Sequence, residues 1–157
     1  MSFNLNTPFS LYSIPVAYFV GLWPAKRRAG LIDQTIGFDN TLPRANVGRL
    51  HEYPDVSPEV TERAERLEGA HKNSLEILPL WIGAVLTGNI AGLDDVFLNI
   101  ASASFLGLRL LYNFIYVNQK SNRQGTLRSI TWLAGLSIPI TVIVRAANRL
   151  RSLKAAA

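Results

Sequence analysis

An arginine stands alone in the most apolar part of the sequence. Arg109 is the only charged residue between Val96 and Val117, a segment long enough to cross a bilayer. An ionised side chain near the middle of a membrane costs on the order of 3 kcal/mol unless water or a partner meets it, so such a residue usually marks a site. Tyr112 and Tyr116 follow on the same helical face. We therefore expect binding or chemistry at this face.

A second set of polar residues lies on a segment upstream. At about 100 degrees per residue, one helical face there carries small and polar side chains. Its members are Arg66, Gly69, Asn73, Glu76, Gly83 and Thr87. Where a helix enters lipid, a polar face must point toward other helices or a cavity, so Asn73 and Glu76 should face the same interior as Arg109. Two interpretations stay open: a ligand site, or a structural pair in which Glu76 neutralises Arg109.

Other polar and aromatic residues have simpler explanations. His71 lies off the polar face and is expected to make packing contacts. Lys72 follows Glu68 by four residues, a spacing typical of ion pairs on a solvated helix. We expect Trp81 and Trp132 in lipid or in the core rather than around a cofactor.

Composition indicates a membrane protein with a single domain. The chain has 157 residues, of which 48% are hydrophobic and 17% charged, and its mean hydropathy is +0.16. It is too apolar for an ordinary soluble domain, and its length suits one domain over residues 1–157. The lack of cysteine excludes disulfides, thiolate metal sites and a cysteine nucleophile. Neither His51 nor His71 belongs to a complete set of metal ligands, so we expect no metal.

The positive charge of the chain has two possible meanings. The net charge is +5 with an isoelectric point near 9.9, and residues 145–154 look like a basic arm. A basic arm could bind nucleic acid, but no recognition motif accompanies it. Lys and Arg just outside apolar segments instead meet anionic lipid headgroups. We therefore expect membrane lipids as partners and no nucleic acid.

Four helices should position the polar residues. Their approximate ranges are 9–25, 57–89, 95–119 and 126–150. Ser57 and Asp94 have the residue types that cap the second and third helices. Residues 33–54 are mixed and polar, which predicts a long loop outside the membrane. The expected fold class is all-α, an integral membrane four-helix bundle. The distribution of Lys and Arg favours charged loops toward the cytosol and both termini away from it.

Three motifs in these helices are similar to those of one known family. They are Glu65–Leu80 in the second helix, Arg109–Tyr116 in the third and Leu127–Ile130 at the start of the fourth. In residue type, spacing and order they resemble the MAPEG family, the membrane-associated proteins of eicosanoid and glutathione metabolism. The resemblance covers about residues 60–150. The first helix and the long loop match the family in position more than in motif.

The resemblance implies a homotrimer of four-helix protomers that binds glutathione as a co-substrate between neighbouring subunits, near the cytosolic face. Asn73 and Glu76 would hydrogen-bond the peptide part of glutathione, the acid taking its amino group. Arg109, Tyr112 and Tyr116 would line the same pocket. For a eukaryotic chain, the implied location is the membrane of the endoplasmic reticulum.

The same resemblance assigns catalysis to Arg128 and Ser129. Arg128 would lie beside the glutathione sulfur, with Ser129 as a second donor. A free thiol has a pKa of about 8.5, and an adjacent guanidinium favours the thiolate, which is the nucleophile. The implied activity is a microsomal-type glutathione transferase that joins glutathione to a lipophilic electrophile. Glutathione peroxidase activity is open, as is a role in detoxification or in making a specialised metabolite.

One departure from the family pattern concerns the grip on glutathione. Many members carry an arginine four residues before the asparagine, and this chain has Gly69 there. Arg66, Lys72 or Arg28 are candidates to replace that cation. The departure supports an alternative, a non-catalytic lipid-binding or scaffold member of the family. In a third interpretation, a purely structural membrane subunit, Glu76 and Arg109 would matter only for assembly.

Overall fold

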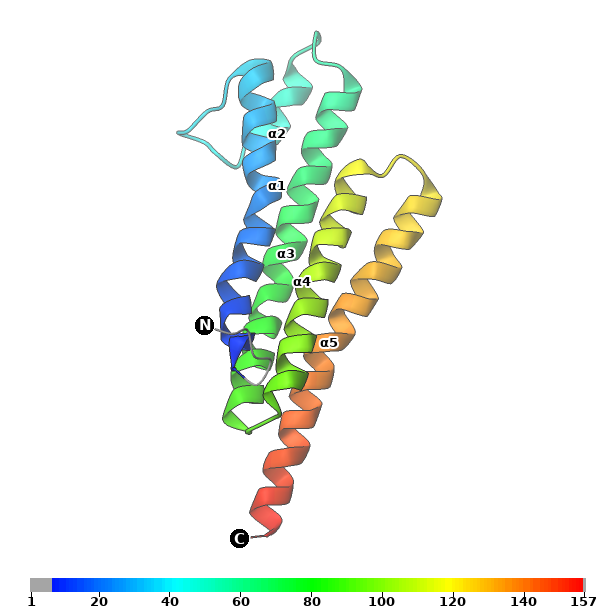
Figure 1. Cartoon of the computed structure of the whole chain (residues 1–157). Coiled ribbons are helices and arrows are strands. Elements are labelled where there is room, and N and C mark those ends of the chain that lie inside the picture. The colour runs from blue at the N-terminus through cyan, green and yellow to red at the C-terminus, as the bar shows by residue number, and fades with distance from the viewer. Residues whose placement is uncertain (1–6, 157) are drawn as a thin grey trace.

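A computed structural model describes residues 7–156 of the chain, and this range is helical without a strand (Figure 1). The predicted all-helical class is confirmed. The elements are η1 (Phe9–Tyr12), α1 (Ser13–Ile36), α2 (Asn46–Arg49), η2 (Leu50–Glu52), α3 (Pro58–Ile90), α4 (Asp95–Asn118) and α5 (Asn122–Ala155), where η denotes a 3-10 helix.

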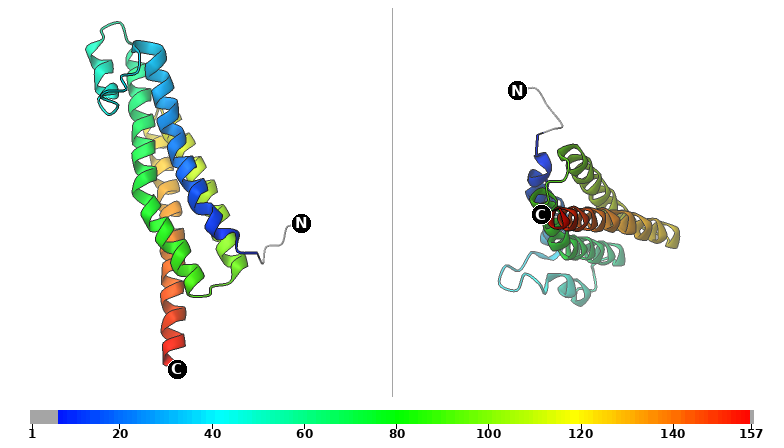
Figure 2. Two further views of the ribbon diagram at one scale, coloured as in Figure 1. Left: turned by 90° about the vertical axis from the view of Figure 1, so that its left-hand side faces the viewer. Right: turned by 90° about the horizontal axis from the view of Figure 1, so that it is seen from below.

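The long helices α1, α3, α4 and α5 lie side by side (Figures 1 and 2). α3 and α4 contact each other, and both contact α1 and α5. α1 therefore covers one side of the α3–α4 pair and α5 covers the other. The turn between α4 and α5 lies at the same end of the molecule as the end of α1 and the start of α3. At the opposite end, α5 extends beyond the other helices.

The largest buried side chains lie where the four long helices meet. Trp81 of α3 stacks on Phe105 of α4 with ring centroids 4.1 Å apart, and both are 1% exposed. The Trp81 indole donates a hydrogen bond to the Ser13 hydroxyl of α1 at 3.1 Å. Val142 of α5 belongs to the same buried cluster. Burial of such aromatic pairs is a main source of stability, so this cluster holds the helices in place.

The first helix is longer than the sequence predicts. We expected it to end near residue 25, but α1 continues to Ile36, and α2 and η2 occupy part of the predicted loop. Ile32 is fully buried against Leu50 and Ala64, so contacts distant in sequence stabilise the added turns. The prediction was wrong here because the cations that follow Pro24 end the apolar segment but do not break a helix.

The other helix boundaries differ less from the predicted ones. α3 and α4 begin and end within one residue of the expected positions. The Asp94 carboxylate caps α4, accepting a hydrogen bond from the Phe97 amide at 2.8 Å. α5 was expected over residues 126–150 and runs from Asn122 to Ala155. Its start is earlier because the Ser121 hydroxyl accepts a hydrogen bond from the Gln124 amide at 3.4 Å.

The segment between α1 and α3 folds around polar side chains. The Asn46 side chain is buried and bonds the backbone of Asp39 in both directions, each at 2.9 Å. The Asp39 carboxylate accepts hydrogen bonds from the hydroxyl and amide of Thr41 at 2.6 and 2.7 Å. These bonds, that of the hydroxyl above all, lower the pKa of Asp39 below its ordinary value. The segment is therefore ordered outside the long helices.

Two of the four long helices, α4 and α5, are long and apolar enough to span a membrane. α1 and α3 differ because charged residues interrupt them, at Lys26 in α1 and up to Glu76 in α3. α4 and α5 also expose large apolar side chains. Examples are Ile100, Leu110, Phe114, Ile130 and Leu133, each more than half exposed. Such a surface suits lipid or another apolar partner.

Candidate functional site

A cavity of about 380 Å³ lies among α3, α4 and α5. Its lining consists of Gly69, Lys72, Asn73, Glu76, Tyr112, Tyr116, Arg128, Ser129 and Trp132. The helical period explains this arrangement, because Asn73 and Glu76 share one face of α3 while Tyr112 and Tyr116 share one face of α4. The structure thus brings together seven of the nine residues that the sequence analysis singled out. The two others, Arg66 and Arg109, lie next to the cavity.

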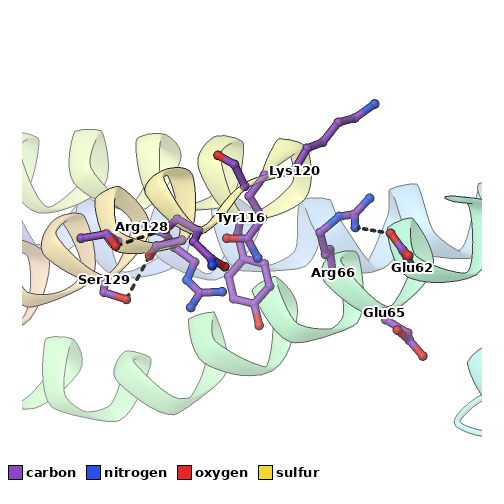
Figure 3. Close-up of a pocket in the computed structure, with 12 residues that line it drawn as sticks. Glu62, Glu65, Arg66, Tyr116, Lys120, Arg128 and Ser129 are labelled. Atoms are coloured by element: carbon purple, nitrogen blue, oxygen red, sulfur yellow. Dashed lines mark hydrogen bonds and ion pairs between the residues drawn. The ribbon is translucent and has the colours of Figure 1, made fainter.

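Arg128 reaches the cavity from the second turn of α5. Its guanidinium carbon lies 4.7 Å from the centre of the Tyr116 ring, a cation–π distance (Figure 3). Arg128 forms no ion pair with any carboxylate among residues 7–156. The neighbouring Ser129 hydroxyl donates to the Gly125 carbonyl at 3.1 Å, so it must rotate before it can donate to a ligand. The half-buried Arg128 guanidinium can therefore pair with an anionic ligand in the cavity.

A larger cavity of about 870 Å³ adjoins the first toward the α4–α5 turn (Figure 3). The two cavities share Tyr116, Arg128 and Ser129 in their linings. Arg66 lines the larger one, donating from Nη1 to the Glu62 carboxylate at 3.2 Å and from Nε to the Val117 carbonyl at 3.3 Å. Together the cavities lead from a charged end of the molecule to Arg128. Volumes of roughly 300–1,000 Å³ are typical of small-molecule sites.

Arg109 lies behind the smaller cavity rather than in its wall. Its side chain is 3% exposed and donates from Nη2 to the side-chain oxygens of Asn73 and Ser74, both at 3.1 Å. The guanidinium also lies 4.4 Å from the centre of the Tyr112 ring. We expected Arg109 to line the pocket, and in the single chain it lies directly behind the lining residues. Arg109 instead orients Asn73 and Tyr112, which do line the cavity.

The structural pair between Glu76 and Arg109 is absent from the described residues. Asn73 and Ser74 take the guanidinium instead, because they lie one turn earlier on α3, opposite Arg109. The Glu76 side chain is exposed and forms no ion pair within residues 7–156. Its carboxylate consequently faces the cavity as an acceptor without a cationic partner.

Two of the candidates to replace the missing family arginine share one carboxylate. Lys72 lies 3.0 Å and Arg28 lies 3.5 Å from the same Glu68 oxygen. Lys72 forms the predicted ion pair with Glu68 and also lines the smaller cavity. Arg28 lines neither cavity. Lys72 and Arg66 are therefore the candidates that this chain places beside the site, one in each cavity.

Gly69 lets the Tyr116 ring lie against α3. A Cβ added at Gly69 would meet the Tyr116 hydroxyl and would lie 2.9 Å from the ring carbon Cζ. Tyr116 also contacts Tyr112 edge-to-face, with ring centroids 5.6 Å apart. The aromatic ring thus occupies the space in front of Gly69. In this position the ring contacts the Arg128 guanidinium. The absence of a side chain at Gly69 therefore determines where Tyr116, and with it Arg128, can lie.

Trp132 is a lining residue that the sequence analysis missed. It was expected in lipid or in the core, yet it lines the 380 Å³ cavity and is 36% exposed. Its spacing of four residues from Arg128 places both on one face of α5, a signal that could have revealed it. Trp132 also lines a smaller, mostly apolar cavity of about 130 Å³, whose lining includes Leu80 and Leu136.

On the other side of the α3–α4 pair, the contact with α1 is closed around Gly21 and Ser74. A Cβ added at Gly21 would lie 2.8 Å from the Ser74 Cβ. The Gly21 carbonyl accepts a hydrogen bond from His71 Nδ1 at 2.8 Å, which requires the proton on that nitrogen. Asn113 Nδ2 donates to the Val20 carbonyl at 3.1 Å. His71 therefore makes a packing contact between helices, the role expected for it.

The chemistry of the two cavities suits a small polar molecule with charges of both signs. Arg128, Lys72 and Arg66 offer cations for carboxylates or a thiolate, and Glu76 offers an acceptor for an ammonium group. Within residues 7–156, no group of three or more His, Asp or Glu could hold a metal ion. The tyrosines and Trp132 supply apolar surface between these polar groups.

Fold and site together define the class of this protein: an all-helical chain with helices able to span a membrane and a mixed-charge cavity among three of them. The chain belongs to the MAPEG family, whose sequence model matches residues 10–148. The match includes the first helix, which the sequence motifs alone did not cover. No curated protein and no solved structure matches the chain.

Proposed function

We propose that this protein is a membrane-bound glutathione transferase that joins glutathione to lipophilic electrophiles. The observation that carries the proposal is the meeting of Arg128, Glu76 and Asn73 in one cavity, in a chain of the MAPEG family. Glutathione carries two carboxylates, an ammonium group, amides and a thiol. Glu76 suits the ammonium group, Asn73 suits an amide, and Arg128 suits the thiolate. Peroxidase activity at the same thiolate is a variant of this proposal.

The proposed chemistry depends on the charge of Arg128. A guanidinium in a partly buried setting stabilises a nearby thiolate, because the low local dielectric strengthens the attraction. The sulfur lone pair then attacks the electrophilic carbon, forming the carbon–sulfur bond. With an aryl halide as acceptor, the halide leaves with the bonding electrons. Tyr116 holds the guanidinium through the cation–π contact, which supports its role in positioning Arg128.

The small apolar cavity beyond Trp132 supports a lipophilic second substrate. It shares Asn73, Glu76 and Trp132 with the 380 Å³ cavity, and the rest of its lining is aliphatic. An apolar acceptor could lie there with its reactive carbon toward Arg128. The aliphatic part of the lining favours an apolar acceptor.

The test removes the Arg128 charge. In Arg128→Ala, turnover of a model aryl halide with glutathione at neutral pH should fall by at least about tenfold, because the thiol pKa rises by one unit or more. The rising limb of the pH dependence of kcat/KM should move to higher pH by the same amount. Ultraviolet absorbance of the thiolate, measured when glutathione is added to purified protein, should fall in parallel.

Arg123→Ala is the matched control. Arg123 is an exposed arginine in the first turn of α5 and lines neither cavity. This variant should keep the turnover and the pH dependence of the unchanged protein. If Arg128→Ala conjugates at the original rate with an unmoved pH profile, Arg128 has no part in the mechanism.

The assembly and location belong to the same proposal. We propose a homotrimer with glutathione between neighbouring subunits, and, for a eukaryotic chain, a location in the endoplasmic reticulum membrane. The apolar surfaces of α4 and α5 and the open side of the cavity support a neighbour there. Mass measurement of the detergent-purified protein should yield three chains per particle. A monomer that binds and conjugates glutathione would contradict the shared site.

A second candidate function is a non-catalytic lipid-binding or scaffold role. Gly69, which stands in place of the family arginine and has Tyr116 against it, favours this candidate by reducing the cations available to glutathione. Calorimetric titration of purified protein with glutathione separates the two. Absence of binding at millimolar concentration would leave only the second candidate.

A further inference from the structure

A third cavity lies on the opposite side of α3 from the proposed glutathione site. It is a groove of about 530 Å³ lined by residues of α1, α3 and α4. None of its lining residues lines either of the two cavities around Arg128. The ends of α1 and α4 that form it lie at the same end of the molecule as the α4–α5 turn (Figure 1). The proposed enzyme chemistry makes no use of this groove.

The groove is positively charged. Lys26 and Arg27 of α1 and Arg63 of α3 line it, and its lining within the described residues contains no carboxylate. All three cations are exposed, and none forms an ion pair with another residue of 7–156. Arg66 and Lys72 on the other side of α3 both have acidic partners. The three unpaired cations therefore leave a local charge that an anion can neutralise.

The floor of the groove is apolar. Leu67 is 3% exposed beneath it, while Phe114 and Trp23 stand in its walls at 64% and 45% exposed. The uncharged part of α1 ends just before Lys26, and α4 ends at Asn118, so both helices reach the end of their apolar stretch at this level. Tryptophan is enriched at the boundary between lipid and water. The groove thus combines cations, Trp23 and an apolar floor at the level where a membrane surface would lie.

We infer that this groove binds an anionic phospholipid, with the phosphate of the headgroup among Lys26, Arg27 and Arg63 and an acyl chain along Phe114. The charge selects an anion, and the apolar floor selects an amphiphile over a small ion. Each Lys or Arg near an anionic surface strengthens the attraction to anionic lipid, and three that converge on one headgroup act together. The lipid would fill the groove between α1 and α4 from the membrane side.

The probes are dioleoyl phosphatidylglycerol, dioleoyl phosphatidylcholine and inorganic phosphate, added to the full chain in neutral detergent. Native mass spectrometry measures the affinity for the first bound lipid, and phosphatidylglycerol should bind about tenfold more tightly than phosphatidylcholine. The variant Lys26→Gln/Arg27→Gln/Arg63→Gln should lose this preference. The matched control Arg149→Gln/Arg151→Gln/Lys154→Gln removes the same charge from the far end of α5 and should keep it.

A second variant tests the groove without changing charge. Gly30 lines the groove, and a Cβ added there meets nothing within 4 Å, so we choose Gly30→Phe to add bulk at the groove without a clash at Cβ. Gly30→Phe should lower the affinity for the first bound phosphatidylglycerol by about tenfold. Gly107→Phe on α4 is the control, because its added Cβ also meets nothing within 4 Å. This readout stays available if the triple variant fails to fold.

Three results would overturn the inference. One is a lipid preference that survives both groove variants or falls equally in the controls, which would make the attraction general. Another is displacement of the lipid by inorganic phosphate at equal concentration, which would make the groove a site for free anions. The last is a change of oligomeric state by the groove variants in phosphatidylcholine with lipid preference unchanged, which would make a second copy of the chain the occupant.

Discussion

The two sides of the α3–α4 pair differ at the level of the proposed site. Toward α1 the contact is closed: Gly21 leaves room for Ser74, and buried Asn113 bonds the backbone of α1. Toward α5 the helices border open cavities, and Arg128 lies against the Tyr116 ring without an ion pair to any described residue. Around Ser74 and Arg109 the two helices are therefore closely packed against α1 and open toward α5, while the third groove lies nearer the end of α1.

The difference shows how packing on one side of a helix pair can fix the polar side chains that line a cavity on the other. Arg109 connects the sides, because its Nη2 bonds Asn73 at the cavity and Ser74 at the closed contact. The closed side therefore supplies fixed positions for the side chains that the open side presents. Side chains that are already held in place reduce the free-energy cost of binding, because they lose less conformational entropy when the ligand binds.

The largest effect should come from breaking the closed side. Gly21→Ala places a Cβ 2.8 Å from the Ser74 Cβ, an atom attached directly to the α3 backbone. The helices must separate, so we expect the free energy of unfolding to fall by about 3 kcal/mol, measured by denaturant titration in mixed micelles. Gly30→Ala, on the same helix with nothing within 4 Å of the new Cβ, is the control and should be neutral or slightly stabilising. Equal losses in both variants would show that the closed contact has no special role.

A smaller loss is expected from the hydrogen bonds across that contact. Asn113 is 2% exposed, and Asn113→Ala leaves the part-buried Val20 carbonyl without this donor. We expect the free energy of unfolding to fall by about 2 kcal/mol. Asn118→Ala on the same helix removes only an exposed bond to Phe114 and should change it by less than about 0.5 kcal/mol. A similar small change for Asn113→Ala would mean that water replaces its bond.

Much of the open side could be predicted from the sequence. The helical period alone placed Asn73 with Glu76, and Tyr112 with Tyr116, on faces that do line one cavity. Arg128 joined them through the family resemblance, since nothing in the sequence of α5 indicates which helix it will face.

The partners of Arg109 could not be predicted in the same way. Periodicity defines a face but not the register between two helices, and a shift of one turn decides between Asn73 and Glu76 as the partner. The end of α1 was missed for a related reason, because the turns up to Ile36 depend on contacts of Ile32 with residues far along the chain. Both failures concern interhelical contacts, which no local pattern encodes.

On the open side, a glycine substitution should change binding more than stability. In Gly69→Ala the colliding group is the end of the Tyr116 side chain, which can move into the cavity. We expect the free energy of unfolding to change by less than about 1 kcal/mol. The displaced Tyr116 should move Arg128, so the affinity for glutathione measured by calorimetry should fall about fivefold, close to 1 kcal/mol of binding free energy. Gly83→Ala, with nothing within 4 Å of its Cβ, is the control and should bind normally. A stability loss as large as that of Gly21→Ala would show that the two sides are equally rigid.

The smallest effect should come from the ion pair that connects the α4–α5 turn to α3. Lys120 Nζ lies 3.2 Å from a Glu59 carboxylate oxygen, and the two side chains are 74% and 73% exposed. Water and salt screen such a pair, so Lys120→Gln should lower the free energy of unfolding by less than about 0.5 kcal/mol. A double-mutant cycle with Glu59→Gln isolates the pair. A coupling energy above about 1 kcal/mol would mean that the ion pair fixes the α4–α5 turn against α3. The cavities around Arg128 would then be held rigidly at that end of the molecule.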